Sequence, residues 1–112
     1  MYIILVEQDI IYLNRFIWNK KKAQGNIKKR HISFEVAARV FLDPVLYVVY
    51  DEENSTQEEE RYNCIGVIDN QYAVIVVSMT EREPYTRIFS ARKATAKERR
   101  DYEKNAKNIR GY

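Results

Sequence analysis

The chain has 112 residues, of which 46% are hydrophobic and 31% charged; this balance is typical of one folded domain and excludes a disordered chain. It contains one cysteine, Cys64, and one histidine, His31, which excludes a disulfide within the chain and a zinc site built from four Cys or His ligands. The longest apolar runs, residues 45–50 and 72–77, are too short for a membrane helix, which needs about 20 residues.

Charge is unevenly distributed along the chain, although 19 basic and 16 acidic residues give a net charge of only +3. Basic residues concentrate in residues 15–30 and 87–110, and acidic residues concentrate between them, in residues 51–60. Each basic block taken alone is consistent with an ordinary solvated surface. If the fold brings both blocks together, they would attract an anionic partner such as a nucleic acid.

Two apolar runs make up most of residues 1–14, which lack the basic leader region and the cleavage site of a signal peptide. An edge strand or a short helix is one interpretation of this segment. We interpret it instead as an N-terminal extension ahead of a single domain that spans residues 15–112.

The next part of the chain is predicted to form a strand and two helices. Phe16-Ile17-Trp18 has the composition of a short strand, and Asn19 is a favourable N-cap for a basic helix that continues to about Lys29. Ser33 is a second N-cap, ahead of apolar residues at helical spacing, and Asp43-Pro44 ends this second helix.

An antiparallel meander and a final helix are predicted for the rest of the chain. Strands are indicated at residues 45–51, 60–68, 71–80 and 85–92, with a tight turn at Asp69-Asn70. Thr95 and Glu98 form a capping box that begins the last helix. The sequence therefore predicts an α+β fold with two N-terminal helices, an antiparallel sheet of about four strands and a C-terminal helix. We expect the core to include Trp18, Tyr47, Tyr50, Cys64 and Tyr72.

Short motifs follow one another between Phe16 and Glu103. They are Phe16-Ile17-Trp18, Asn26-Ile27-Lys28-Lys29, Ser33-Phe34-Glu35-Val36-Ala37-Ala38, Phe41-Leu42-Asp43-Pro44, Glu59-Glu60-Arg61-Tyr62 with Gly66, Thr80-Glu81-Arg82, Arg87-Ile88-Phe89-Ser90-Ala91-Arg92-Lys93-Ala94-Thr95, and Glu98-Arg99-Arg100 before Tyr102-Glu103. Together they resemble the BrnT family of bacterial type II toxins. The resemblance implies the fold of the RelE ribonuclease toxins and cleavage of RNA that inhibits translation in the cytoplasm. It also implies a cognate ribbon-helix-helix antitoxin similar to BrnA. The toxin would then contact operator DNA only indirectly, through this antitoxin.

An RNA strand can be cleaved by attack of its own 2′-hydroxyl on the adjacent phosphorus, so the protein needs neither a metal nor another cofactor. It must stabilise the charge on the phosphorane, which suits the two-donor fork of arginine, and it must assist two proton transfers. We predict that Arg61, Arg87 and Arg92 bind the phosphate. The candidates for proton transfer are Glu60, Tyr62, Tyr102 and His31, of which we assign Glu60 and Tyr62 to the catalytic site. Ion pairing with the acidic residues 51–60 is the alternative role of these arginines.

The faces of the predicted strand at residues 85–92 matter for this site, because strict alternation places Arg87 and Arg92 on opposite faces. The two side chains converge only if the strand bulges or ends before Arg92.

RNA contacts are predicted from basic, polar and aromatic side chains of both basic blocks. These are Lys28, Lys29, Arg30, His31, Ser90, Lys93, Arg99 and Tyr102. Tyr62, Tyr85 and Tyr102 are candidates for stacking on unpaired bases. His31 lies at a predicted helix end, one place after the usual family histidine position, which Arg30 holds here; a cation that stabilises the helix C-terminus is its alternative role.

We therefore predict a metal-independent endoribonuclease toxin that binds RNA and an antitoxin and has no membrane partner. A non-catalytic nucleic-acid-binding module would use the same basic blocks for affinity alone. A partner-binding domain with an apolar patch covered by another chain is the third hypothesis. Cleavage of RNA in EDTA separates the first hypothesis from the other two.

Overall fold

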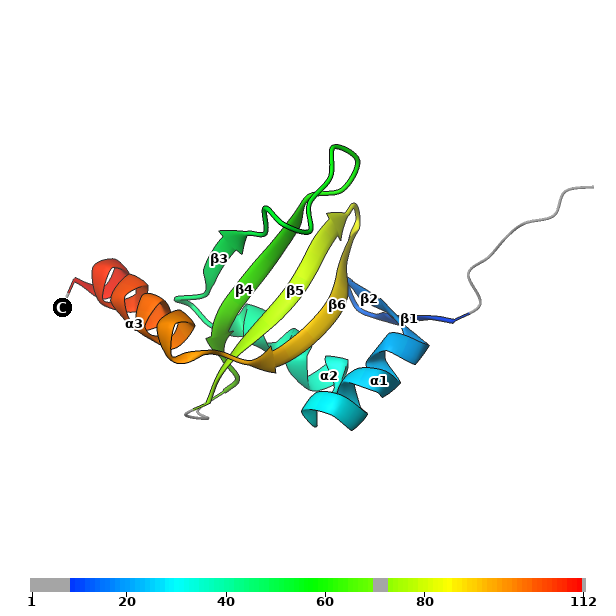
Figure 1. Ribbon diagram of the computed structural model, residues 1–112, viewed down its shortest axis with the longest axis horizontal. Coiled ribbons are helices and arrows are strands. Elements are labelled where there is room, and N and C mark those ends of the chain that lie inside the picture. Colours follow the sequence, from blue (N-terminus) through cyan, green and yellow to red (C-terminus); the bar gives the residue numbers. More distant parts are fainter. Residues whose placement is uncertain (1–8, 70–72, 112) are drawn as a thin grey trace, which may run out of the picture.

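The computed structural model describes residues 9–69 and 73–111, which form one sheet with helices on both faces (Figure 1). Six strands pair in the order β1-β2-β6-β5-β4-β3. The strands are β1 Ile10–Leu13, β2 Phe16–Asn19, β3 Tyr47–Tyr50, β4 Arg61–Val67, β5 Val74–Arg82 and β6 Tyr85–Lys93. The helices are α1 Lys20–Arg30, α2 Phe34–Ala37, the 3-10 helix η1 Ala38–Leu42, and α3 Ala96–Arg110. No helix within these described ranges combines the length and the apolar character needed to cross a membrane.

The α+β class is confirmed, but the sheet differs from the prediction in size and type. It has six strands instead of about four, and it is mixed because β2 runs parallel to β6, whereas the other neighbours are antiparallel. The second predicted helix is also divided, because α2 continues as the 3-10 helix η1 before ending at Asp43. The predicted turn at Asp69-Asn70 extends outside the described residues.

The segment interpreted as an N-terminal extension contributes a strand to the sheet. Ile10–Leu13 pairs antiparallel with β2, and Ile11 packs against buried side chains of the core. Asn14, at φ 53°, takes part in the tight turn between the two strands. The edge-strand interpretation therefore holds for these four residues, whereas the apolar run at residues 2–6 lies outside the described part of the chain.

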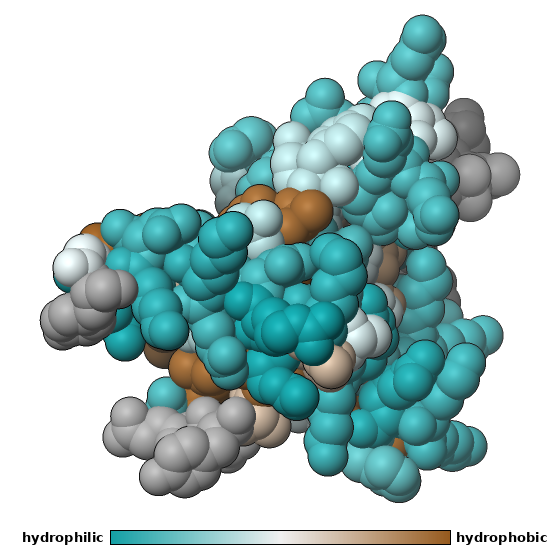
Figure 2. Space-filling model, turned by 60° about the vertical axis from the view of Figure 1, so that its left-hand side comes forward, coloured by the Kyte–Doolittle hydropathy of each residue, from teal (hydrophilic) through white to brown (hydrophobic). Residues whose placement is uncertain are grey.

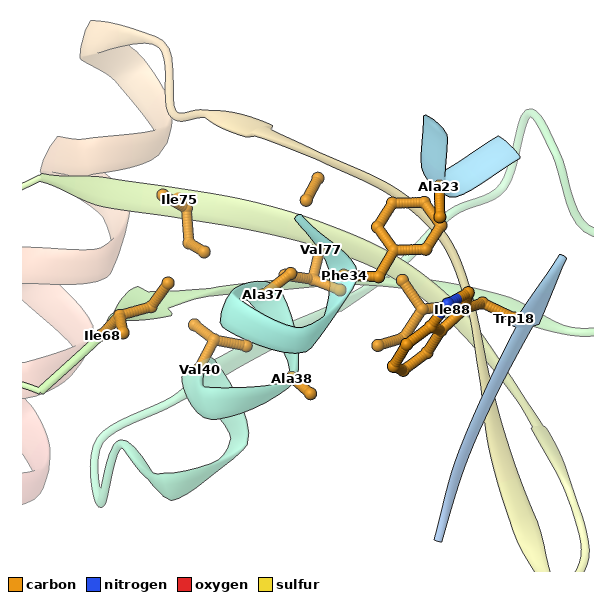
Figure 3. Close-up of a cluster of buried hydrophobic side chains, with 11 residues drawn as sticks. Trp18, Ala23, Phe34, Ala37, Ala38, Val40, Ile68, Ile75, Val77 and Ile88 are labelled. Atoms are coloured by element: carbon orange, nitrogen blue, oxygen red, sulfur yellow. The ribbon is translucent and has the colours of Figure 1, made fainter. Parts of the chain in front are cut away.

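One hydrophobic core lies between the sheet and the helices α1, α2 and η1, and we call this side of the sheet the α2 face. Phe34, directly after the N-cap Ser33, is completely buried and points toward the sheet (Figure 3). Its ring meets Trp18 edge to face, with the two ring centroids 6.0 Å apart. Ile88 and Val77 complete this contact from β6 and β5. Burial of Trp18 confirms its predicted core position.

A second, smaller core lies on the opposite side, which we call the α3 face. Tyr102 of α3 packs there on Ile65 and Val76 of the sheet. Its hydroxyl donates a hydrogen bond to Oδ2 of Asp43 (2.6 Å), and burial together with this bond raises the pKa of Tyr102. The ring of Tyr102, a predicted RNA contact, is thus buried in this core, and its hydroxyl is bonded to Asp43.

The side chain of Asn26 attaches α1 to the sheet. β2 pairs with β6 only at Thr86 and Arg87, so the later part of β6 has no strand neighbour on that side. There Asn26 takes the place of a strand: its Oδ1 accepts from the N–H of Ala91 (3.1 Å), and its Nδ2 donates to the carbonyl of Ala91 (3.0 Å). One amide side chain thus satisfies both backbone groups of a buried residue.

We expect Asn26→Ala to lower the free energy of unfolding by about 2–4 kcal/mol, because two backbone groups of Ala91 lose their partners and each costs roughly 1–3 kcal/mol when left unsatisfied. Urea unfolding measures the change. Gln24→Ala, at an exposed position of the same helix, is the matched control and should be nearly neutral. A loss below about 0.5 kcal/mol for Asn26→Ala, the level usual for a surface substitution, would contradict this role.

Candidate active site

A β-bulge in β6 determines which side chains share the α3 face. Ser78 of β5 pairs with Ser90, but the next residue, Met79, pairs with Ile88. Phe89 is therefore an extra residue of β6 that has no pairing partner in β5. Because of this shift, Arg87 lies opposite Thr80 and Arg92 lies opposite Val76. Both arginines therefore point to the α3 face, which fulfils the condition stated above for their convergence.

Arg61 and Arg87 belong to one row of paired residues across three strands. Arg61 of β4 lies opposite Thr80 of β5, and Thr80 lies opposite Arg87 of β6. Strands are about 4.8 Å apart, which places the two arginine backbones roughly 10 Å from each other, on the same face. Arg87 is 9% exposed, so its charge is held among packed side chains, where it is screened less than at a free surface.

The ring of Phe89 brings three cations together. The distance from the ring centroid is 3.9 Å to Cζ of Arg61, 5.1 Å to Nζ of Lys22 and 5.8 Å to Cζ of Arg87. We call these four residues the Phe89 cluster. Lys22 lies in the first turn of α1, so the cluster joins the first basic block to the second. The two blocks converge, as anion binding requires.

Glu59 of the acidic segment holds Arg61 from one side. Its carboxylate accepts from Nε of Arg61 (3.0 Å) and from Nη2 of Arg82 (2.6 Å). The bond from Arg82 and then that from Arg61 hold the pKa of Glu59 below its usual range, against the opposing effect of burial. The ion-pair role that was the alternative for Arg61 is therefore present, but it uses only the Nε edge of the guanidinium.

Arg92 has a different role, because Glu98 of α3 binds both of its terminal nitrogens. Nη1 and Nη2 of Arg92 donate to the two carboxylate oxygens at 2.7 and 2.9 Å. Glu98 also accepts from the backbone N–H of Thr95, which confirms the capping box. The hydrogen bonds from Arg92 are the main reason that the pKa of Glu98 is lowered to about 2. Arg92 thus attaches α3 to the sheet.

Glu60 and Tyr62 are not brought to the arginine row. Tyr62 pairs with Met79, which pairs with Ile88, so its side chain lies on the α2 face. There its hydroxyl donates to Glu60 (2.9 Å), a contact that raises the pKa of Tyr62, and its ring meets Tyr50 at 5.6 Å. Tyr50 is 50% exposed, so its predicted core position is wrong.

The remaining predicted RNA contacts are spread over the surface. Lys28, Lys29, Arg30 and His31 are exposed at the end of α1, where His31 adopts a left-handed conformation and its N–H donates to the carbonyl of Ile27. Lys93 lies on the α2 face and lines a shallow apolar groove together with His31. Ser90 is exposed on the α3 face beside the Phe89 cluster, and Arg99 is exposed on α3.

A cavity of about 700 Å³ opens near the same end of the sheet, but its lining does not suit a phosphate. Four acidic side chains, Glu58, Glu59, Glu60 and Glu81, line it alongside Arg82. Among the residues that the structure describes, no group of three or more His, Cys, Asp or Glu side chains is placed to hold a metal ion. Burial raises the pKa of the Cys64 thiol to about 12, which leaves it unreactive as a nucleophile.

Two residues of this site, Lys22 and Phe89, were not singled out from the sequence. The signal for Lys22 was the run Lys20-Lys21-Lys22 directly after a predicted strand. Phe89 lies between the two predicted arginines, but its role depends on the bulge.

With α3 turned to the front, the surface is mainly hydrophilic, with small apolar patches (Figure 2).

Comparison with known proteins identifies the family of the chain. Residues 18–98 match the family model described as the ribonuclease toxin, BrnT, of type II toxin-antitoxin systems. The chain therefore belongs to the BrnT family, a class of ribonuclease toxins whose type II organisation implies an RNA target and an antitoxin partner. A search of curated proteins finds no match to the chain.

The Arg92–Glu98 pair predicts a pH-dependent contribution to stability. Because the pKa of Glu98 is lower in the folded chain than in the unfolded one, its contribution is complete above about pH 5 and is lost as the pH falls toward 2. We expect Glu98→Gln to lower the free energy of unfolding by about 1.5–3 kcal/mol near neutral pH, as is usual for hydrogen bonds to charged groups, while keeping a residue suited to the capping box.

Urea unfolding at about pH 7 and at about pH 3 measures this effect, because the difference between Glu98→Gln and the unsubstituted chain should shrink as Glu98 becomes protonated. Glu103→Gln, at an exposed position of α3, is the control. A difference that stayed constant with pH would mean that the carboxylate charge is not what stabilises the contact.

Proposed function

We propose that this chain is a metal-independent endoribonuclease that cleaves RNA, inhibits translation and is neutralised by a ribbon-helix-helix antitoxin of the BrnA type. Membership of a family of ribonuclease toxins supports the class of activity. The observation that carries the proposed site is the row Arg61–Thr80–Arg87 on the α3 face, with Lys22 joined to it through Phe89. We therefore assign the RNA phosphate to this row.

The proposed chemistry uses the substrate's own nucleophile. The 2′-oxygen forms a bond to phosphorus, the bond from phosphorus to the 5′-oxygen breaks, and the products carry a cyclic phosphate and a free 5′-hydroxyl. Arg61 and Arg87 donate hydrogen bonds to the non-bridging oxygens, whose negative charge increases in the transition state. The partial burial of Arg87 strengthens this stabilisation, since fewer water molecules screen its charge.

Of the five residues predicted to be catalytic, we retain Arg61 and Arg87 for this role. Arg92 is bound by Glu98 through both terminal nitrogens, so it stabilises the fold. Tyr62, with Glu60 bonded to it, would have to act from the other side of the sheet. We assign neither of them a proton transfer at this site.

Removal of either retained arginine is expected to reduce RNA cleavage. Arg61→Ala and Arg87→Lys, which keeps the charge but loses the planar fork, should each slow cleavage in EDTA by about 10²–10³, the usual effect of losing a transition-state donor. Arg100→Ala, at an exposed position of α3, is the control and should cleave normally. Melting temperatures report whether each variant folds.

Normal cleavage by folded Arg61→Ala and Arg87→Lys would contradict the assignment. Binding of RNA by the unsubstituted chain without cleavage would instead favour the non-catalytic nucleic-acid-binding module.

RNA affinity is expected to fall steeply with salt, because each phosphate contact on a single strand contributes about −0.7 to the slope of log affinity against log salt. A non-cleavable RNA with a 2′-deoxy substitution allows this slope to be measured at equilibrium. Arg61→Ala should make the slope shallower by about 0.7, whereas Arg100→Ala should leave it unchanged. An affinity independent of salt would exclude the phosphate contacts that the site requires.

A further inference from the structure

We propose that Phe89 is a positioning residue of the RNA site: its ring holds the guanidinium of Arg61 so that the two terminal nitrogens are directed at the phosphate. This inference rests on the proposed function. It also goes beyond it, because Phe89 carries no group that could bind or cleave a phosphodiester. Its effect on the reaction passes through Arg61.

The first observation is the way in which Arg61 is held. Its Nε donates to Glu59 (3.0 Å), and its Cζ lies 3.9 Å from the centroid of the Phe89 ring, which is the distance of direct contact between a guanidinium and an aromatic ring. The Nε edge of the group is therefore fixed by Glu59, and the group also lies in contact with the ring. Arginine is a long side chain that loses considerable freedom when ordered, so a site that has ordered it beforehand binds its ligand more tightly.

The second observation concerns the edge of Arg61 that remains. Among the described residues, neither Nη atom of Arg61 has a hydrogen-bond partner, and the side chain is 30% exposed. The two Nη donors form the edge that binds the oxygens of a phosphate in pairs. Arg92 on the same face provides the contrast, since both of its Nη atoms are occupied by Glu98.

The third observation is that the other cations of the cluster surround the same ring. Nζ of Lys22 lies 5.1 Å and Cζ of Arg87 lies 5.8 Å from the centroid. Like charges at such short range repel one another, and within the described chain Glu59 is the carboxylate bonded to Arg61. The electron-rich face of the ring attracts cations, and an added phosphate would be attracted by the same cations. Phe89 therefore links the cations into one anion site.

The test is a double-mutant cycle between Phe89 and Arg61. Phe89→Leu keeps an apolar side chain of similar size but removes the aromatic face, whereas Phe89→Tyr keeps that face. We expect Phe89→Leu to reduce RNA cleavage by about 3- to 30-fold, the range that corresponds to loss of a cation–π contact. The Phe89→Tyr variant, which keeps the aromatic face, should cleave RNA at the rate of the unsubstituted chain. In the Arg61→Ala background, Phe89→Leu should change cleavage by less than about twofold, because the two substitutions remove the same interaction.

Phe41→Leu is the matched control. Phe41 is another half-buried phenylalanine, with Arg15 at 5.8 Å from its ring centroid, and it lies on η1, away from the site. Its substitution should leave cleavage unchanged and report any general cost of losing an aromatic ring, which melting temperatures measure for all variants.

Three outcomes would overturn the inference: Phe89→Leu cleaves as the unsubstituted chain does, Phe89→Tyr fails to restore cleavage, or Phe89→Leu has its full effect in the Arg61→Ala background. The last result would mean that the ring contacts RNA itself, for example by stacking on a base. If the unsubstituted chain cleaves no RNA, the proposed function fails. The same cycle, measured as affinity for the non-cleavable RNA, then decides the role of Phe89 by the same criteria.

Discussion

Phe89 is an extra residue of β6 without a pairing partner in β5, and this β-bulge determines which side chains of β6 lie on each face of the sheet. Ile88 and Ala91 are three positions apart, so regular alternation would place them on opposite faces. The bulge allows both to enter the core on the α2 face, while Arg87 and Arg92 both lie on the α3 face. Core packing and the arrangement of charge are therefore consequences of the same local irregularity.

The arginines on the α3 face differ in how their hydrogen-bond donors are used. Both terminal nitrogens of Arg92 donate hydrogen bonds to Glu98, and this contact connects α3 to the sheet. The guanidinium of Arg61 is bonded through Nε alone and contacts an aromatic ring, so among the described residues its terminal nitrogens have no hydrogen-bond partner. Residue type does not separate a structural arginine from a functional one. The distribution of partners around each guanidinium does, because only a group fixed from behind can present a preformed edge to a ligand.

Features set by neighbouring residues could be predicted from the sequence, whereas features set by distant partners could not. Asn19 caps α1 and Thr95 caps α3 as expected, because an N-cap depends on backbone groups two or three residues away. The bulge depends on which residues of β5 face β6, and no local pattern specifies that register. Tyr102 carries the chemistry of a base-stacking residue, but Asp43, far away in sequence, holds it in the core. The edge strand Ile10–Leu13 is short and is recognisable only through its pairing with β2.

The attachment of α1 to the sheet also restricts how this chain can vary in length. Lys22 and Asn26 are four residues apart, so they lie on the same side of the helix, and that side faces β6. Each residue of a helix turns by about 100°, so one residue inserted or removed between them would carry Lys22 away from the ring of Phe89 while Asn26 stayed bonded to Ala91. Gly25 lies within this interval, and a Cβ atom added there would meet no other atom within 4 Å, so a larger residue fits at this position. At position 25 the presence of a residue is therefore under a stricter constraint than its identity.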